Sequence, residues 1–194
     1  MRTLTFVAAA VASLGLSINP LPAQTWTQTA APVQTWKSIA SSADGTKLVA
    51  MGGNGDSSYV STNSGVTWTL TPVAGGGIVA SSTNGTKLVM VNGNLMYAST
   101  NSGNSWPLLT TAPDEYWQSI ACSADGAKLV AVTSSDADGN PGTIYRSTDS
   151  GNTWTHLTAP SNYWSIVSSS ADGTKLAIMN FNFWWLGTMR FYSL

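Results

Sequence analysis

Short apolar runs separated by polar turns follow one another along most of the chain. A typical unit begins with residues 36–41, turns at Asp44 and Gly45, and continues through the apolar run 47–51. Because glycine accepts the positive φ of a tight hairpin, this pattern predicts two antiparallel strands. The second strand is apolar almost throughout, which is typical of a strand buried on both faces. No segment after the N-terminus has a helical period, so the sequence predicts an all-β fold.

The same unit recurs four times along the chain. The turn glycines of successive units are Gly45, Gly85, Gly126 and Gly173. The steps between them are 40, 41 and 47 residues, and each unit has room for a third strand, such as 144–147, and a fourth, such as 153–157. A period of about 40 residues with four strands is typical of a β-propeller blade. A β-sandwich would not explain near-identical repeats, so we predict a β-propeller of about four four-stranded blades.

A second motif, Ser-Thr-Asn/Asp-Ser-Gly-x-Thr/Ser-Trp, follows in three of the units. Its main positions are Ser61, Asn63, Gly65 and Trp68, then Ser99, Asn101, Gly103 and Trp106, then Ser147, Asp149, Gly151 and Trp154. This motif resembles the Asp box, or bacterial neuraminidase repeat, of sialidase-like propellers, and of secreted repeat proteins of the photosystem II assembly-factor type. The resemblance implies structural hairpins away from any active site, with left-handed glycines and each Trp packed into its sheet.

The repeats also suggest how the domain, expected over residues 24–194, is divided. Blades are predicted at about 36–71, 77–110, 116–158 and 163–194. The fourth unit lacks the second motif, but residues 25–29 match the outer strand 153–157. The N-terminal strand can therefore complete the last blade, which removes the open sheet edges and predicts a monomer. The other interpretation is a fragment of a larger propeller whose remaining blades carry the function.

The N-terminus has the pattern of a secretory signal peptide over residues 1–23. Arg2 is followed by an apolar run, and Ala23 offers a small residue for cleavage, so we expect a secreted, periplasmic or cell-surface protein. The net charge of −1 and the eight scattered Lys and Arg residues exclude a basic nucleic-acid patch. No later apolar run is long enough for a transmembrane segment. Cys122 is the single cysteine and is expected to be a small buried hydrophobe.

Strand order places the near-identical turns at one edge of the blades. The connections that differ between blades lie at the opposite edge, which we call the variable edge. Loops that no structural template constrains often carry binding residues. The candidate binding residues there are Trp36, Trp117, Trp164, Tyr116, Tyr163, Asp114 and Glu115. Their rings can stack on sugars or on apolar side chains of a protein. Alternatively, the tryptophans plug the channel and wedge between blades.

The variable edge also contains a weak metal motif. Asp136, Asp138 and Asn140 alternate as oxygen ligands do at the start of a calcium loop, but Pro141 stands where such a loop needs glycine. An exposed turn-rich loop explains these residues better, so no metal or cofactor is expected.

Catalytic residues are scarce. Sialidase chemistry needs three arginines, a Tyr activated by a Glu, and an Asp, but only Arg146 and Arg190 remain after the signal. Paired carboxylates of a glycosidase would have to come from Asp114, Glu115, Asp136 and Asp138. We therefore expect a non-catalytic propeller that binds a protein or glycan through the variable edge. The alternative is a glycosidase remnant or a truncated part of a larger propeller.

Overall fold

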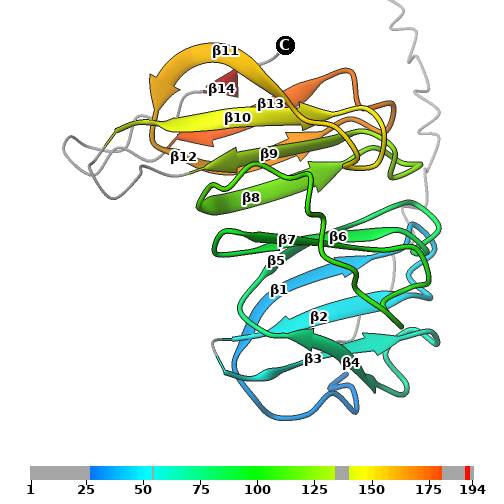
Figure 1. Cartoon of the computed structure of the whole chain (residues 1–194). Helices are drawn as coiled ribbons and strands as arrows, with labels where there is room; N and C mark the ends of the chain where they lie inside the picture. Colours follow the sequence, from blue (N-terminus) through cyan, green and yellow to red (C-terminus); the bar gives the residue numbers. More distant parts are fainter. Residues whose placement is uncertain (1–26, 54, 134–139, 181–190, 193–194) are drawn as a thin grey trace, which may run out of the picture.

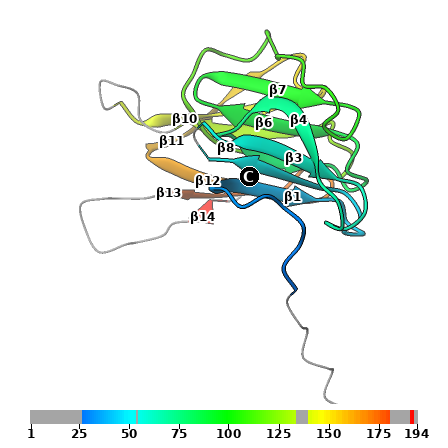
Figure 2. The ribbon, with the colours of Figure 1, turned by 90° about the horizontal axis from the view of Figure 1, so that it is seen from below.

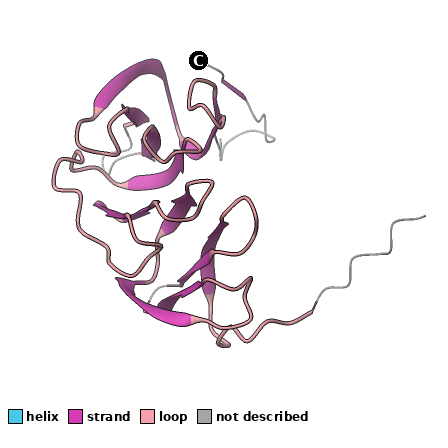
Figure 3. Cartoon of the chain, turned by 90° about the vertical axis from the view of Figure 1, so that its right-hand side faces the viewer, coloured by secondary structure: helices cyan, strands magenta, loops and turns pink. Residues whose placement is uncertain are grey.

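Four antiparallel β-sheets stack on one another in sequence order (Figure 1). The computed structural model describes residues 27–53, 55–133, 140–180 and 191–192, and the side chains of 159–161 and 191–192 are outside this description. All regular structure in these residues is β-strand, and loops join the strands (Figure 3). The expectation of an all-β chain built from repeated propeller-like blades is confirmed.

The strands follow one another across each sheet from its first strand to its last. The first sheet contains β1 (Trp36–Ser41), β2 (Leu48–Gly52), β3 (Ser57–Ser61) and β4 (Thr69–Ala74). The second contains β5 (Ile78–Ser81), β6 (Leu88–Asn92) and β7 (Leu95–Ser99), and a bridge between Tyr97 and Leu108 marks its outer edge. The third contains β8 (Trp117–Cys122), β9 (Leu129–Thr133), β10 (Gly142–Ser147) and β11 (Thr155–Asn162). The fourth contains β12 (Trp164–Ser169), β13 (Leu176–Asn180) and β14 (Phe191–Tyr192).

The Asp-Gly turns of three sheets and the Asn-Gly turn of the second sheet join the first two strands with the same pattern of serine hydrogen bonds. In the first sheet, the Ser42 hydroxyl donates to Asp44 Oδ1 at 2.6 Å, and the Lys47 amide donates back to Ser42 Oγ at 3.0 Å. Gly45 has a φ of +70°, in the left-handed region that a side chain rarely adopts. Equivalent bonds from Lys87, Lys128 and Lys175 close the other three turns. We call these four turns the inner turns.

The hydrophobic core is divided into three layers, one between each pair of neighbouring sheets. The second strands of the second and third sheets each supply both of the layers beside them, because their side chains alternate between the two faces. In β6, Leu88 and Met90 face the first sheet, whereas Val89 and Val91 face the third. Every residue of β9 is buried, as the apolar run predicts. In β13 burial alternates, and Ala177 is exposed.

The first and last sheets lie at opposite ends of the stack (Figure 1). Residues 27–29, the described part of the predicted closing strand, form no strand with the fourth sheet. Thr29 lies instead beside Gly65 of the first sheet, where a methyl group on Gly65 would come within 3.3 Å of Thr29 Cγ2. Figure 2 views the molecule from the side of the first sheet, from which the N-terminal segment leads away. In its described residues the chain is an open stack of four blades.

Candidate functional site

The second motif forms three equivalent turns, which we call the outer turns. The amides of Gly65, Gly103 and Gly151 each donate to the hydroxyl of the serine four residues earlier, at 2.9 Å in all three turns. The glycines have φ values of +83°, +85° and +91°, as the sequence predicts. The serines before them, Ser64, Ser102 and Ser150, are also left-handed, which sequence reasoning did not anticipate.

Asn and Asp perform the same role in these turns. Asn63 Oδ1 accepts from the Thr67 amide at 2.9 Å, and Asp149 Oδ1 accepts from the Thr153 amide at the same distance. Each side-chain oxygen accepts a hydrogen bond from a backbone amide of its own turn, so these amides find their partners locally. These bonds hold the outer turns in shape, although the buried Trp68 Nε1 of the first turn has no hydrogen-bond partner among the described residues.

The tryptophans at the variable edge differ in exposure. Each of Trp36, Trp117 and Trp164 begins the first strand of its sheet at a register shift of the β-bulge type. Trp117 is 7% exposed and Trp164 only 2%, so both rings pack between sheets. Trp36 is 39% exposed, since no sheet precedes its own. The wedge interpretation thus describes Trp117 and Trp164, whose rings do not reach the surface.

Two tyrosines at the variable edge are exposed. Tyr116 immediately precedes β8 and is 67% exposed, whereas Tyr163 immediately precedes β12 and is 44% exposed. β8 and β12 are neighbouring strands of adjacent sheets, so the two tyrosines occupy equivalent positions in adjacent blades. They form a pair of accessible aromatic rings on one edge, which a flat ligand surface can contact.

The two acidic candidates beside Tyr116 both have partners. Glu115 Oε1 accepts a 3.0 Å hydrogen bond from the Tyr145 hydroxyl, and Asp114 Oδ1 accepts one of 3.0 Å from Asn94 Nδ2. Burial raises the pKa of Tyr145, and the hydrogen bond and the charge of Glu115 raise it further. The raised pKa keeps the Tyr145 hydroxyl protonated at neutral pH, so it is the hydrogen-bond donor to Glu115.

Tyr145 belongs to an aromatic cluster in the third sheet. Its ring makes edge contacts with Trp117 at 5.6 Å and with His156 at 5.3 Å between centroids, and Trp117 lies 6.1 Å from Trp154. Glu115 therefore fixes a loop of the variable edge onto this cluster. The sequence offered no signal for this contact, since Glu115 and Tyr145 are thirty residues apart.

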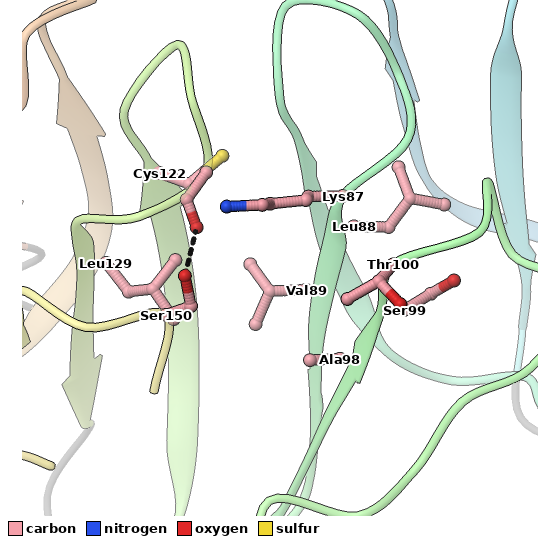
Figure 4. A pocket seen from close by; sticks show the side chains of 10 residues that line it. Lys87, Leu88, Val89, Ala98, Ser99, Thr100, Cys122, Leu129 and Ser150 are labelled. Carbon is pink, nitrogen blue, oxygen red and sulfur yellow. Dashed lines mark hydrogen bonds between the residues drawn. The ribbon is translucent and has the colours of Figure 1, made fainter. Parts of the chain in front are cut away.

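A small hollow between the second and third sheets is shown in Figure 4. Its volume is about 70 Å³, and mostly apolar side chains such as Val89, Leu129 and Cys122 line it. At its rim, the Ser150 hydroxyl donates to the Gly126 carbonyl at 3.3 Å. Ligand pockets usually have volumes of roughly 300–1,000 Å³, so this hollow is a packing defect and not a small-molecule site.

The remaining candidates lie apart from the tyrosine pair or outside the described residues. Asp136, Asp138 and Arg190 lie outside the described residues, and Asn140 is exposed. Arg146 lies on β10 beside Thr148 and Thr155, in the outer part of the third sheet. Among the described residues, no group of three or more His, Cys, Asp or Glu side chains could hold a metal ion. The part of the chain that the structure describes also contains no helix suited to crossing a membrane.

The comparisons with known proteins give structural likenesses only. No protein-family model and no curated protein matches the sequence. An ancestral GH74 enzyme is similar over 83% of this chain and 27% of its own, with a TM-score of 0.61 and 16% identity. YCF48 bound to D1 peptide is similar over 82% of this chain and 54% of its own, with a TM-score of 0.55 and 18% identity. The nidogen/laminin complex is similar over 77% of this chain and 58% of its own, with a TM-score of 0.62 and 13% identity. This chain thus spans about a quarter to three fifths of these proteins, and the likeness shows a β-propeller fold.

Proposed function

We propose that this protein is a non-catalytic propeller that binds a protein or a glycan at its variable edge. The observation that carries the proposal is the exposure of Tyr116 and Tyr163 at equivalent positions of adjacent blades. Glu115 stiffens the loop that presents Tyr116, because its carboxylate is bonded to Tyr145 in the sheet behind. A rigid aromatic pair loses little conformational entropy when a partner is bound.

The rest of the molecule supports this edge over the opposite one. The inner turns are joined to one another, and they repeat nearly the same polar residues from blade to blade. The loops of the variable edge differ in each blade, so only this edge offers a surface specific to one partner. Solved propellers of similar fold include a complex with a peptide and a complex of two proteins, as well as a xyloglucanase.

The test compares the unaltered chain with the double variant Tyr116→Ala/Tyr163→Ala on xyloglucan oligosaccharides, a wider glycan array and an array of unstructured peptides. Both tyrosines are exposed, so the variant should fold normally. We expect at least one ligand class to bind the unaltered chain and to bind the variant at least tenfold more weakly. An aromatic contact contributes about 0.5–1.5 kcal/mol beyond its buried area, and 1.4 kcal/mol corresponds to about tenfold in affinity.

The matched control is Leu70→Ala, because Leu70 is 59% exposed on the outer strand β4 and away from this edge. Equal binding by the double variant and the unaltered chain would contradict the proposal, as would the absence of binding on every array.

A glycosidase or its remnant is the second candidate, supported by the likeness to GH74 enzymes. Its test is hydrolysis of xyloglucan by the unaltered chain and by the variant Asp114→Asn/Glu115→Gln. Hydrolysis that disappears in this variant would replace the binding proposal with an enzymatic one.

We also propose that the protein is secreted, periplasmic or at the cell surface, since residues 1–23 have the pattern of a signal peptide. We further propose that the outer turns are Asp boxes of the bacterial neuraminidase repeat, on the strength of their sequence pattern and bonding. N-terminal sequencing of the exported protein should begin at Gln24. A protein that keeps Met1 and stays in the cytoplasm would contradict export.

A further inference from the structure

The two ends of the stack expose faces that are buried everywhere else in the molecule. The first face, on the first sheet, has an apolar hollow of about 400 Å³, lined by the exposed Trp36 and Ile39, the half-buried Leu48 and Trp68, and the buried Ala50. The last face, on the fourth sheet, contains Ile166, Ala177 and Met179. Exposed apolar faces of this kind can serve as protein–protein contacts.

The repeats show what covers such faces. Ile39 is 65% exposed, but its equivalents Val79, Ile120 and Val167 are 7%, 4% and 4% exposed because the preceding sheet packs on them. On the opposite side, Ala177 is exposed, whereas its equivalents Val49, Val89 and Val130 are all buried under the following sheet. In every interface of this molecule, the cover of one blade is another blade of the same repeat.

The inner turns carry a backbone hydrogen-bond ladder across the stack. The Ala43 amide donates to the Thr83 carbonyl, the Thr83 amide to the Ala124 carbonyl, and the Ala124 amide to the Ala171 carbonyl, at 2.7–2.8 Å. Within the described residues, the ladder leaves the Ala171 amide as a donor at one end and the Ala43 carbonyl as an acceptor at the other. Because the ladder runs from each amide to the next carbonyl, these two free groups fit each other.

The lysines of the inner turns also leave complementary groups at the two ends of the stack. Methyl groups placed on Gly85, Gly126 and Gly173 would lie 2.8–2.9 Å from the nearest carbon of the preceding blade's lysine, so each lysine stem covers the next turn. Lys128 Nζ also donates to the Asp172 carbonyl at 2.7 Å. A methyl group on Gly45 meets nothing within 4 Å, so the first inner turn, with the acidic Asp44, lacks its lysine. In the part of the chain that the structure describes, no further turn follows Lys175 of the last blade.

The N-terminal segment marks the place of a blade before the first. Thr71 of the first sheet and Thr111, which follows the second, donate to the carbonyls of Gly103 and Gly151 in the next outer turns. Thr29 lies beside Gly65 in the corresponding position. Residues 27–29 therefore stand where the outer strand of a preceding blade belongs, although the fourth sheet is at the far end of the stack.

We propose that two copies of this chain associate head to tail, with the last face of each copy on the first face of the other, and close an eight-bladed ring. Within the described residues no sheet covers the two ends of the stack, but a second copy supplies each missing surface: Ile166 for Ile39, the Ala171 amide for the Ala43 carbonyl, and Lys175 for Gly45 and Asp44. Residues 27–29 then form the outer strand of the partner copy's fourth sheet. A head-to-tail contact between two different faces yields a closed ring when the rotation that relates the copies returns to the starting copy. Known propellers have about 4–8 blades.

The first test is sedimentation velocity of the purified chain over a hundredfold range of concentration. We expect a dimer of the 20.3 kDa chain that dissociates on dilution. The variant Ile39→Glu places a charge in the proposed contact but on the surface of a single copy, so it should fold and sediment as a monomer. The control is Val66→Glu, because Val66 is 67% exposed and its equivalents Asn104 and Asn152 stay exposed within the stack. A monomer at every concentration, or an open polymer, would overturn the proposal.

The second test separates two copies from one chain that closes on itself. The pair Ala43→Cys/Ala171→Cys is introduced with Cys122→Ser, and the purified protein is oxidised. The proposal predicts a disulfide-linked dimer on a non-reducing gel. The control pair Thr83→Cys/Ala124→Cys should form its bridge within one chain, since the structure joins these residues. A 43–171 bridge within a monomer would show a four-bladed ring and contradict the dimer.

Discussion

The hydroxyl of Thr71 donates a 2.6 Å hydrogen bond to the carbonyl oxygen of Gly103, which belongs to the next blade. Trp106 Nε1 in turn donates to Thr71 Oγ1 at 2.7 Å, and all three groups are buried. The contact recurs between Thr111 and Gly151, at 2.7 Å. One threonine hydroxyl thus joins an outer strand to the outer turn of its neighbour, and the stack depends on these bonds as well as on apolar packing.

Replacing Thr71 by Val should lower the free energy of unfolding by about 0.5–1.5 kcal/mol, because the bonds of Thr71 are lost while Trp106 Nε1 keeps its 3.1 Å bond to the Gly103 carbonyl. The measurement is urea denaturation followed by tryptophan fluorescence. Thr69→Val is the control, since Thr69 lies on the same strand but is exposed. Equal losses in the two variants would show that the hydroxyl bond has no special role.

Acid should destabilise the protein through its turn aspartates. Hydrogen bonds from Thr153 and Ser147 lower the pKa of Asp149 to about 2, and hydrogen bonds from Ser42 and Thr46 lower that of Asp44 to about 2. These pKa values lie below that of an unfolded chain, so the stability is fully present above about pH 4 and is lost as the pH falls toward 2. Urea denaturation at a series of pH values should show this decline.

Asp149→Asn is the variant that tests this loss of stability in acid. Asn63 and Asn101 already hold the same position in the other outer turns, so the variant should fold normally. Its stability should depend less steeply on pH between 4 and 2 than that of the unaltered chain. An unchanged pH dependence would mean that Asp149 is not a source of the acid sensitivity.

Tyr145 should ionise above the usual range of a tyrosine. Burial and the Glu115 carboxylate both disfavour its phenolate, with burial the larger effect. The measurement is an alkaline titration followed by phenolate absorption. The ionisation of Tyr145 is obtained as the difference in absorption between the unaltered chain and Tyr145→Phe. In Glu115→Gln the midpoint should fall but remain raised, because the burial is unchanged. A midpoint that does not move in Glu115→Gln would indicate that the hydrogen bond does not form in solution.

Cys122 should be nearly inert toward thiol reagents in the folded protein. Burial, with a smaller effect from the Asp125 charge, raises the pKa of its thiol to about 11, so little reactive thiolate is present at pH 8. Reaction with Ellman's reagent should be slow under native conditions and fast in concentrated urea. Equally fast reaction in both conditions would place the thiol on an open surface.

Much of the architecture could be predicted from the sequence because each blade is determined locally. The inner and outer turns close with bonds between residues at most five positions apart, such as Ser42 with Lys47 and Ser61 with Gly65. The left-handed glycines of these turns therefore appear directly as repeated glycines in the sequence, whereas the left-handed Ser64, Ser102 and Ser150 have no such signal. The apolar strands follow these turns at fixed distances, so their order and their burial could be predicted as well.

The candidate site was predicted less well, because exposure depends on neighbouring blades. Trp117 and Trp164 occupy the same repeat position as Trp36, yet only Trp36 is exposed, since its sheet has no predecessor. The β-bulge at the start of these strands has no clear sequence signal. Likewise, the bond between Glu115 and Tyr145 joins loops that only the tertiary structure brings together.

The sequence by itself determined the repeated unit, its four-strand plan and its turns, because those features arise from interactions between residues close in the chain. The tertiary structure decided which faces remain open and where the ends of the stack lie, because these depend on how one blade packs on the next. Identical repeats present identical faces, so no single repeat reveals whether its neighbour is present. Only the assembled stack shows that Ile39 and Ile166 lack the cover that their equivalents have.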